Sequence, residues 1–308
     1  MRKGFKIFQS RLSPLRPLPQ GDVVHKIGAV STPPSFDRHG PEQPVSPVVL
    51  SVPHAGRDYP LSLRAALRVP LASLLPLEDR HIDTLALAAR GTETLFVASR
   101  ARAWIDLNRA EHERDPRVDE GAEPVPEGAQ SLKLRSGLGL VPRRASGADL
   151  WRRRFAAEEV RERIERDHRP YHAAVSAALE AARARFGVAV LLDVHSMPPL
   201  ASGAARIVIG DRFGRSAAAR FVSRIEGVIH AAGVRSAVNT PYAGGHVLDR
   251  HADPVANIHA VQIELDRTLY LDRRRDQPGP GMDASAALLR RIIDAVSDEA
   301  LPLAAAAQ

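Results

Sequence analysis

Short runs of Val and Leu recur along the chain, and two of them end in a histidine. Val48–Val52 is followed by Pro53 and His54, and Val188–Val194 is followed by His195. Each run is too short to span a membrane, and its continuous apolar character is typical of a strand buried on both faces. Because open α/β sheets bind ligands at the carboxyl ends of their parallel strands, we expect both histidines at one site.

Helical periodicity alternates with these apolar runs, and together the two patterns predict the fold class. We expect strands at residues 47–53, 94–98, 103–107, 188–194, 206–210, 234–238 and 261–265. Helices are expected from the acidic pair Glu78-Asp79 to Gly91, over about 149–186 with a break near Pro170, and over 214–232 and 281–297. Strands that alternate with helices indicate an α/β fold with a mainly parallel sheet covered on both faces.

The composition changes at both ends of the chain and in its middle. Residues 1–45 are rich in Pro, Arg, Ser and Gly without a sustained period, so we expect a poorly ordered tail. A single domain is predicted over 46–300, and the Ala-rich end 301–308 is expected to fray. Residues 111–149 are polar and largely aperiodic. A loop of this length inside a domain is usually a functional lid or substrate loop.

The composition also excludes several classes of protein. The 308 residues include no cysteine, so His, Asp or Glu must hold any metal, and thiolate nucleophiles and disulfides are excluded. The formal net charge is +7, but acids are interleaved with the basic residues, as in 158–163, which is typical of a solvated helix face. No run approaches the roughly 20 apolar residues of a membrane helix, and no signal peptide is evident. We therefore expect a cytoplasmic protein that binds neither nucleic acid nor membranes; its oligomeric state stays open.

Polar side chains gather at the predicted strand ends, where the sheet would bring them together. This set contains His54, Glu78, Asp79, Asp83, Asp106, Asn108, Arg109, Asp193, His195, His246 and Glu264. Two histidines and one carboxylate are usual ligands of a catalytic zinc ion, whose fourth position stays open. Such an ion would polarise a carbonyl and lower the pKa of its bound water from about 15.7 towards 7. Glu264 is the strongest candidate for a general base, because an acid within an apolar strand is costly unless it is paired or functional.

A structural role is the alternative for each of these residues. A strand-end histidine is often only hydrogen-bonded, Asp79 and Asp83 can serve as acids at a helix N-terminus, and Glu264 can form an ion pair with Arg267 or Arg109. A serine hydrolase is disfavoured because Ser196 lies outside any Gly-x-Ser-x-Gly elbow, and no Gly-x-Gly-x-x-Gly or P-loop pattern supports nucleotide binding.

Six short motifs together resemble the N-formylglutamate amidohydrolase family over about residues 47–297, in order and in approximate spacing. They are Ser51-Val52-Pro53-His54-Ala55-Gly56, Asp79-Arg80-His81-Ile82-Asp83, Ile105-Asp106-Leu107-Asn108-Arg109, Leu192-Asp193-Val194-His195-Ser196, Gly244-Gly245-His246-Val247 and Val261-Gln262-Ile263-Glu264-Leu265. The resemblance implies a three-layer α/β/α fold with a mixed, mainly parallel central sheet, similar to zinc carboxypeptidases. It also implies zinc-dependent hydrolysis of an N-acyl amino acid, N-formyl-L-glutamate above all, at the end of one route of histidine degradation.

The resemblance further implies a role for each matched residue. His54, His195 and one carboxylate would hold a single Zn²⁺, with another divalent ion as the alternative metal. Asp79 is the preferred third ligand, and Asp83 is the alternative. Glu264 would be the general base and proton shuttle. The residues expected to bind the anionic substrate are Asn108, Arg109, Arg152, Gly245 and His246, since an arginine fork suits a carboxylate. Asp193 and Ser196 are expected to support the ligands from behind.

Two departures from the family pattern concern the substrate rather than the metal. After Asn108-Arg109 the family continues with an acid, whereas this chain has Ala110-Glu111-His112, and residues 112–130 do not match in detail. The identity of the acyl amino acid therefore stays open, with a related zinc amidase of different substrate, or a non-catalytic protein that binds a small anion, as alternatives.

Overall fold

A seven-stranded sheet is the centre of the computed structural model, which describes residues 35–306 except 125, 127 and 129. The strand order is β1-β3-β2-β6-β9-β7-β8. The strands are β1 (Phe36–His39), β2 (Val48–Val52), β3 (Thr94–Ala98), β6 (Ala189–Met197), β7 (Ile207–Gly210), β8 (Ser236–Val238) and β9 (Ile258–Asp266). All neighbouring pairs are parallel except β1 with β3 and β7 with β9. The predicted mixed, mainly parallel sheet is therefore confirmed.

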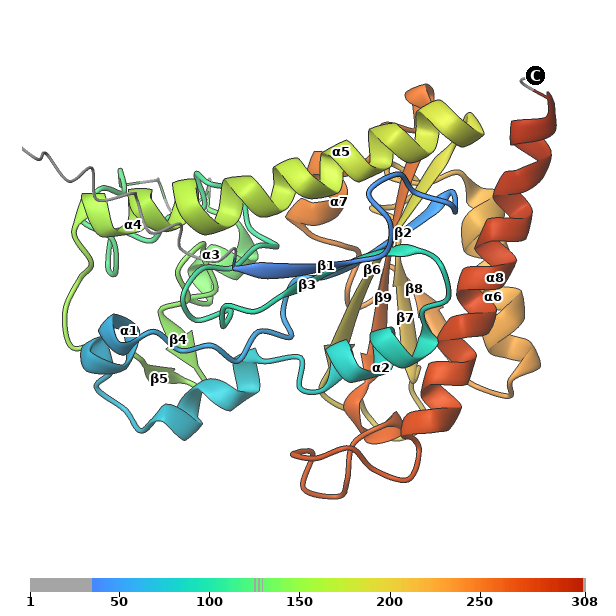
Figure 1. Ribbon diagram of the computed structural model, residues 1–308. Helices are drawn as coiled ribbons and strands as arrows, with labels where there is room; N and C mark the ends of the chain where they lie inside the picture. Colours follow the sequence, from blue (N-terminus) through green and yellow to red (C-terminus); the bar gives the residue numbers. More distant parts are fainter. Residues whose placement is uncertain (1–34, 125, 127, 129, 307–308) are drawn as a thin grey trace, which may run out of the picture. The chain divides into compact units, whose positions relative to one another are not determined.

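Helices cover both faces of this sheet (Figure 1). The longer ones are α2 (Ile82–Ala89), α5 (Arg169–Phe186), α6 (Ala219–Ala231) and α8 (Met282–Ala306). Short ones are α1 (Leu61–Ala66), α3 (Leu132–Arg135), α4 (Ala157–Arg163) and α7 (His246–His251), with 3₁₀ segments at Leu71–Leu77, Pro254–Ala256 and Arg267–Leu269 and a π segment at Ile164–His168. A two-stranded hairpin, β4 (Arg144–Ala145) with β5 (Ala148–Asp149), completes the elements.

Alternate side chains of the strands divide the core into two layers, as the two-residue period of a strand requires. On one face Leu50 and Leu192 pack with the apolar sides of α2, α6 and α8. On the other face Val49 and Leu191 pack with α5, through residues such as Val175. In Figure 1, α5 runs along one side of the sheet, and α2 and α8 lie on the other. Burial of both strand faces accounts for the continuous Val/Leu runs in the sequence.

Three element predictions need correction. Residues 103–107 form turns rather than a strand, because the sheet edge beside β3 is taken by Phe36–His39, which lies inside the segment predicted as a tail. The helix expected from residue 149 begins at Ala157, since 148–149 pairs in the hairpin with 144–145. Near Pro170 the helix continues through a π turn instead of breaking, and α8 runs to Ala306, beyond the predicted end at 297. Residues 1–34 of the predicted tail lie outside the described residues.

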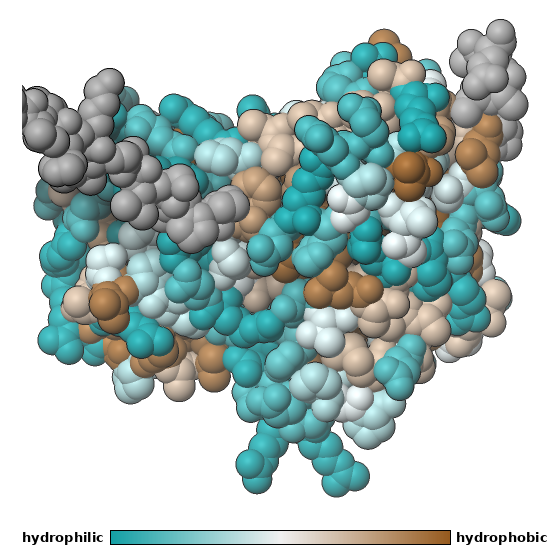
Figure 2. Space-filling model, in the orientation of Figure 1, coloured by the Kyte–Doolittle hydropathy of each residue, from teal (hydrophilic) through white to brown (hydrophobic). Residues whose placement is uncertain are grey.

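The visible surface is mostly hydrophilic, with hydrophobic residues scattered over it (Figure 2). The large apolar side chains that are most exposed, Leu61, Leu132, Phe213 and Val255, come from distant parts of the chain. Among the described residues, no helix has both the length and the apolar character needed to cross a membrane.

Candidate active site

The ends of β2 and β6 bring two histidines to the same point beside one carboxylate. His54 follows β2, His195 lies near the end of β6, and Asp79 follows the 3₁₀ segment Leu71–Leu77. All three side chains are buried, and one potential ligand atom from each lies within 4.8 Å of the others. Asp79 Oδ2 is 3.1 Å from His195 Nδ1 and 3.7 Å from His54 Nδ1.

The hydrogen bonds on the far side of each imidazole fix which nitrogen faces Asp79 with a lone pair. His54 Nε2 is 2.7 Å from Asp106 Oδ1, and His195 Nε2 is 2.8 Å from Asp193 Oδ2. An ionised carboxylate only accepts, so each Nε2 carries the proton and, in a neutral ring, each Nδ1 has a free lone pair. Lone pairs facing the Asp79 carboxylate require a proton or another cation between them.

The donor set fits a zinc ion. Two imidazole nitrogens and one carboxylate oxygen are typical catalytic zinc ligands, and Zn–N and Zn–O bonds near 2.1 Å place tetrahedral ligand atoms about 3.4 Å apart. The two measured Asp79–His separations, 3.1 and 3.7 Å, lie on either side of this value. Ligating histidines usually donate their other N–H to a carboxylate, as both rings do here.

The charges around this cluster also favour a cation. Burial opposes ionisation of the Asp79 carboxyl. Hydrogen bonds and charge from His195 and His54 outweigh this effect and hold the pKa of Asp79 well below its usual range. Burial likewise disfavours protonation of His195, yet the carboxylates of Asp193, Asp79 and Glu264 raise the pKa of His195 well above its usual value. Surrounding acids thus stabilise positive charge at this point.

Asp83, the alternative third ligand, is directed elsewhere. Its carboxylate pairs with the Arg57 guanidinium at 2.5 Å in the first turn of α2. Asp79 and Asp83, four residues apart, do not share a face of one helix, because α2 begins at Ile82 and Asp79 precedes it. Only Asp79 joins the two histidines.

Glu264 lies beside this cluster on the neighbouring strand. It is directly opposite His195 in the parallel register of β6 and β9, and it lines the cavity described below. Burial raises the pKa of Glu264 to about 7, although the charge of His195 opposes the shift. Its carboxylate accepts a hydrogen bond from Gln262 Nε2 at 3.0 Å. The alternative ion pairs are not formed, since Arg267 contacts Asp79 and Arg109 contacts Asp106.

A hydrogen-bond chain supports His195 from behind. Asp193 accepts from Ser51 Oγ at 2.7 Å, and Ser51 is 2.9 Å from the hydroxyl of Tyr171 on α5. Behind His54, Asp106 accepts from Arg102 Nε at 2.8 Å, and Arg102 holds the pKa of this fully buried acid well below its usual range despite the burial. Such buried networks orient the rings that they bond to.

These residues face a cavity of about 760 Å³, large enough for a small metabolite. Its lining includes residues from the predicted functional loop, such as Lys133 and Leu138. Five of the lining side chains are cationic: Arg102, Arg109, Lys133, Arg212 and Arg267. Four acids also line the cavity: Asp79, Glu113, Asp249 and Glu264. The cations that face the cavity can still pair with the carboxylates of an anionic ligand.

Four of the five residues predicted to bind substrate line the cavity: Asn108, Arg109, Gly245 and His246. Asn108 Oδ1 accepts from Val247 N at 2.9 Å, which ties the loop after residue 107 to α7. Ser196, predicted to support the ligands, also lines the cavity and is 3.2 Å from Arg267 Nε.

Arg152 is not brought to the cavity. Its side chain is exposed, and its Nε donates to the carbonyl of Leu67 at 2.5 Å. The backbone N–H of Arg152 also bonds to Ala66, which places the residue against α1. The expectation that Arg152 grips a substrate carboxylate is therefore wrong for this structure.

Sequence reasoning missed several residues of the site. Arg102, Lys133 and Arg267 line the cavity, and Asp106, although noted as a strand-end acid, was given no role. Lys133 lies in the aperiodic loop, where no spacing marks it. Arg267 immediately follows β9, so its position three residues after Glu264 is a signal that could have identified it.

Comparison with known proteins assigns the family. The family model described as N-formylglutamate amidohydrolase matches residues 46–271. An N-formylglutamate deformylase of Pseudomonas putida is 32% identical over 236 residues, which cover 73% of this chain and 82% of the relative. An N-formylglutamate deformylase of Pseudomonas aeruginosa is 30% identical over 239 residues, which cover 74% of this chain and 83% of the relative. The crystal structure of N-formylglutamate amidohydrolase from Ralstonia eutropha JMP134 matches with a TM-score of 0.76 and 32% identity, covering 86% of this chain and 97% of that one. The chain belongs to the N-formylglutamate amidohydrolase family.

Proposed function

We propose that this protein is a zinc-dependent hydrolase that converts N-formyl-L-glutamate to formate and L-glutamate. The observation that carries the proposal is the buried cluster of His54, Asp79 and His195, with Glu264 opposite His195 on the next strand. The names of the related proteins support the substrate. The role in histidine degradation that the family resemblance implies belongs to the same proposal.

His54 Nδ1, His195 Nδ1 and Asp79 Oδ2 would hold the zinc ion. When bound, zinc supplies Lewis acidity, which polarises the formyl carbonyl and makes water more acidic. Asp106 and Asp193 keep both imidazoles in the tautomer that presents Nδ1. The ion-pair network therefore prepares the ligands before substrate arrives.

Glu264 would move the proton of the reaction. With a pKa near 7, its carboxylate can accept a proton from water as the C–O bond forms and release it to the amide nitrogen as the C–N bond breaks. Water is thereby divided between the products: the oxygen enters formate, and both protons end on the amine of glutamate, which leaves as an ammonium group. Glu264 returns to its starting protonation state.

The cationic side chains would bind the two carboxylates of the substrate. Arg109 and Asn108 line the cavity, and Lys133 lines it from the short helix α3. Charge-assisted hydrogen bonds to carboxylates are stronger than neutral ones, so these groups favour a dianion over an uncharged amide. A related amidase acting on another acidic N-acyl amino acid is the second candidate, and a panel of acylated amino acids distinguishes the two.

Two aspartates four residues apart provide the test. Asp79→Asn should lose the zinc ion bound at this cluster and its formate release, because it removes the charged ligand between the two histidines. Asp83→Asn is the matched control and should keep both, since Asp83 contacts Arg57 outside the cluster. Zinc content by elemental analysis and formate release are measured on both variants. Equal zinc content in Asp79→Asn and the unmodified chain would refute the proposed ligand set.

A further inference from the structure

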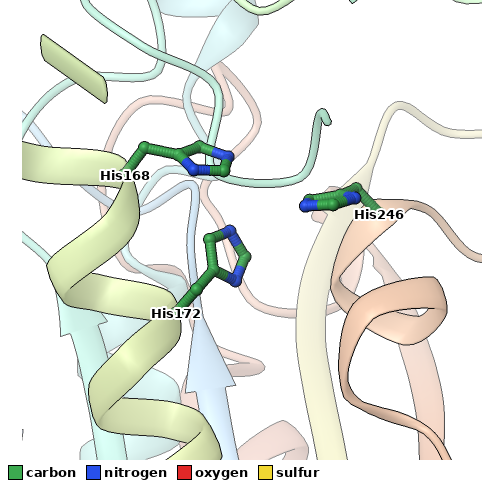
Figure 3. Close-up of side chains that lie close together, drawn as sticks. All are labelled: His168, His172 and His246. Atoms are coloured by element: carbon green, nitrogen blue, oxygen red, sulfur yellow. The ribbon is translucent and has the colours of Figure 1, made fainter. Parts of the chain in front are cut away.

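A second group of imidazoles lies close to the first cluster but shares no residue with it. His168 ends the π segment Ile164–His168, His172 follows in α5, and His246 begins α7. One nitrogen from each ring lies within 4.8 Å of the others. Figure 3 shows the two rings on the long helix facing the ring of His246 across a small gap. The proposed function assigns no metal role to these residues.

His168 has a buried nitrogen that makes no hydrogen bond within the described part of the chain, although the Glu111 carboxylate lies 3.9 Å from it. Its Nε2 donates to the carbonyl of Arg109 at 2.8 Å, and a carbonyl only accepts, so Nδ1 carries the lone pair of the neutral ring. That Nδ1 makes no hydrogen bond among the described residues, and the side chain is only 2% exposed. A buried acceptor without a partner is costly, and a metal ion would relieve this cost.

Both ring nitrogens of His172, the other histidine of this helix, make hydrogen bonds. His172 Nδ1 is 2.9 Å from His251 Nε2, and His172 Nε2 is 2.9 Å from the carbonyl of Leu107. Because His251 can accept as well as donate, His172 can donate Nδ1–H to it and present Nε2 as a ligand. In this structure Nε2 donates to Leu107, because a carbonyl only accepts, and Nδ1 accepts from His251. Metal binding at Nε2 therefore requires His172 to give up its bond to Leu107 and both rings to change tautomer.

The ring positions agree with three imidazoles around one ion. With Zn–N near 2.1 Å, tetrahedral ligands place imidazole ring centres about 5 Å apart. The observed separations are 4.4 Å for His168–His172, 5.2 Å for His172–His246 and 5.7 Å for His168–His246. No helix has to move for the three rings to share an ion.

The protonation states are those of ligands. Burial, aided by the neighbouring histidines, lowers the pKa of His172 well below its usual value and that of His246 to about 4. Burial also lowers the pKa of His168. Neutral imidazoles at neutral pH are ready to bind a metal without first losing a proton. His168-x-x-x-His172 is moreover the helical spacing that places two ligands on one face.

We propose that His168, His172 and His246 form a second binding site for a divalent transition-metal ion of the zinc class. The ion would enter from the cavity, which His246 lines. His168 and His172 also bond the carbonyls of Arg109 and Leu107, on either side of Asn108. Occupancy of the site is thereby linked to the loop that presents Asn108 and Arg109 to the cavity.

An anomalous-scattering experiment on the unmodified chain tests this site directly. Crystals of chelator-stripped protein soaked in zinc chloride should show two peaks, one at His54, Asp79 and His195 and one among His168, His172 and His246. A peak at the first cluster alone, at saturating zinc, would overturn the second site and leave the proposed function intact. A peak among the three histidines alone would support the second site and contradict the zinc ligands proposed for catalysis.

Metal stoichiometry in variants gives an independent readout. The unmodified chain should bind two Co²⁺ ions, and His246→Gln should bind one. His230→Gln, at an exposed position on α6, is the matched control and should bind two. Circular dichroism checks that each variant is folded. Two ions bound by folded His246→Gln, with the cobalt spectrum of the unmodified chain, would refute the assignment.

Discussion

At the scale of single residues, the site contains Glu264 and His195, which face each other on neighbouring parallel strands. The pKa values of both side chains are raised. Burial raises the pKa of Glu264 to about 7, and adjacent carboxylates raise that of His195 despite its burial. Perturbed groups of this kind cluster at functional sites. The pair therefore supports the proposed acid–base role of Glu264 next to His195, a proposed metal ligand.

Replacing Glu264 by Gln tests that role. The amide has nearly the same shape but cannot accept the proton, so turnover should fall by at least about a hundredfold, the low end of general acid–base contributions. Zinc content should stay unchanged, because Glu264 is not among the proposed ligands. Glu113→Gln, another acid of the cavity wall, should keep most of its turnover. Near-normal formate release by Glu264→Gln would show that the base is another group.

Lys133 should contribute to substrate affinity rather than to the chemical step. Its ammonium lies 5.6 Å from the ring centre of Tyr242, and among the described residues it forms no ion pair. A substrate carboxylate would fill that role. Lys133→Met should raise KM for N-formyl-L-glutamate by about ten- to a hundredfold, as the loss of one charged hydrogen bond predicts, with little change in kcat. Lys133→Arg should largely preserve KM. An unchanged KM in Lys133→Met would exclude the contact.

The residues found from sequence and those missed differ in how they reach the site. His54, His195 and Glu264 were identified because strands fix their positions relative to one another. Arg102 lies in a turn and Lys133 on the short helix α3 inside the aperiodic segment, and no local pattern encodes the course of either segment. Arg152 was assigned by chain order alone, and order does not reveal that its side chain turns to Leu67.

At the scale of elements, the apolar runs predicted the strands well, because both faces of the central strands are buried. The predicted strand 103–107 failed for a reason that lies elsewhere in the chain. Antiparallel β1 takes the pairing edge of β3, and the segment is instead held by side chains, as when Arg163 donates to the carbonyl of Trp104. Competition between distant segments for one sheet edge cannot be read from local periodicity.

The close approach of α7 to the loop after residue 107 makes a further prediction. A Cβ on Gly245 would lie 2.4 Å from Asn108 Oδ1, the atom that accepts from Val247 N. Gly245→Ala should therefore displace Asn108 and lower kcat/KM for N-formyl-L-glutamate by about tenfold or more, the equivalent of one lost hydrogen bond. Gly227→Ala, within α6 with open space around it, should leave activity unchanged and increase stability by up to about 1 kcal/mol. Unchanged kcat/KM in Gly245→Ala would show that this contact does not position Asn108.

At the scale of the whole molecule, one edge of the sheet brings together polar side chains from segments that are far apart in sequence. The cluster draws on residues 54, 79 and 195, the neighbouring acid is residue 264, and the cavity is completed by the loop around residue 133. The net charge of +7 includes the five cations of the cavity wall. Under the proposed function, these cations would attract a small dianion.

Formate release by the purified, full-length chain tests the central claim most directly. With N-formyl-L-glutamate as substrate, chelator-stripped protein should be inactive, and one equivalent of zinc at the His54–Asp79–His195 site should restore turnover. N-acetyl-L-glutamate and N-formyl-L-leucine, which change the acyl group and the acidic side chain in turn, should react much more slowly. Formate release that survives complete removal of metal, or none from N-formyl-L-glutamate by the zinc-loaded chain, would contradict the account.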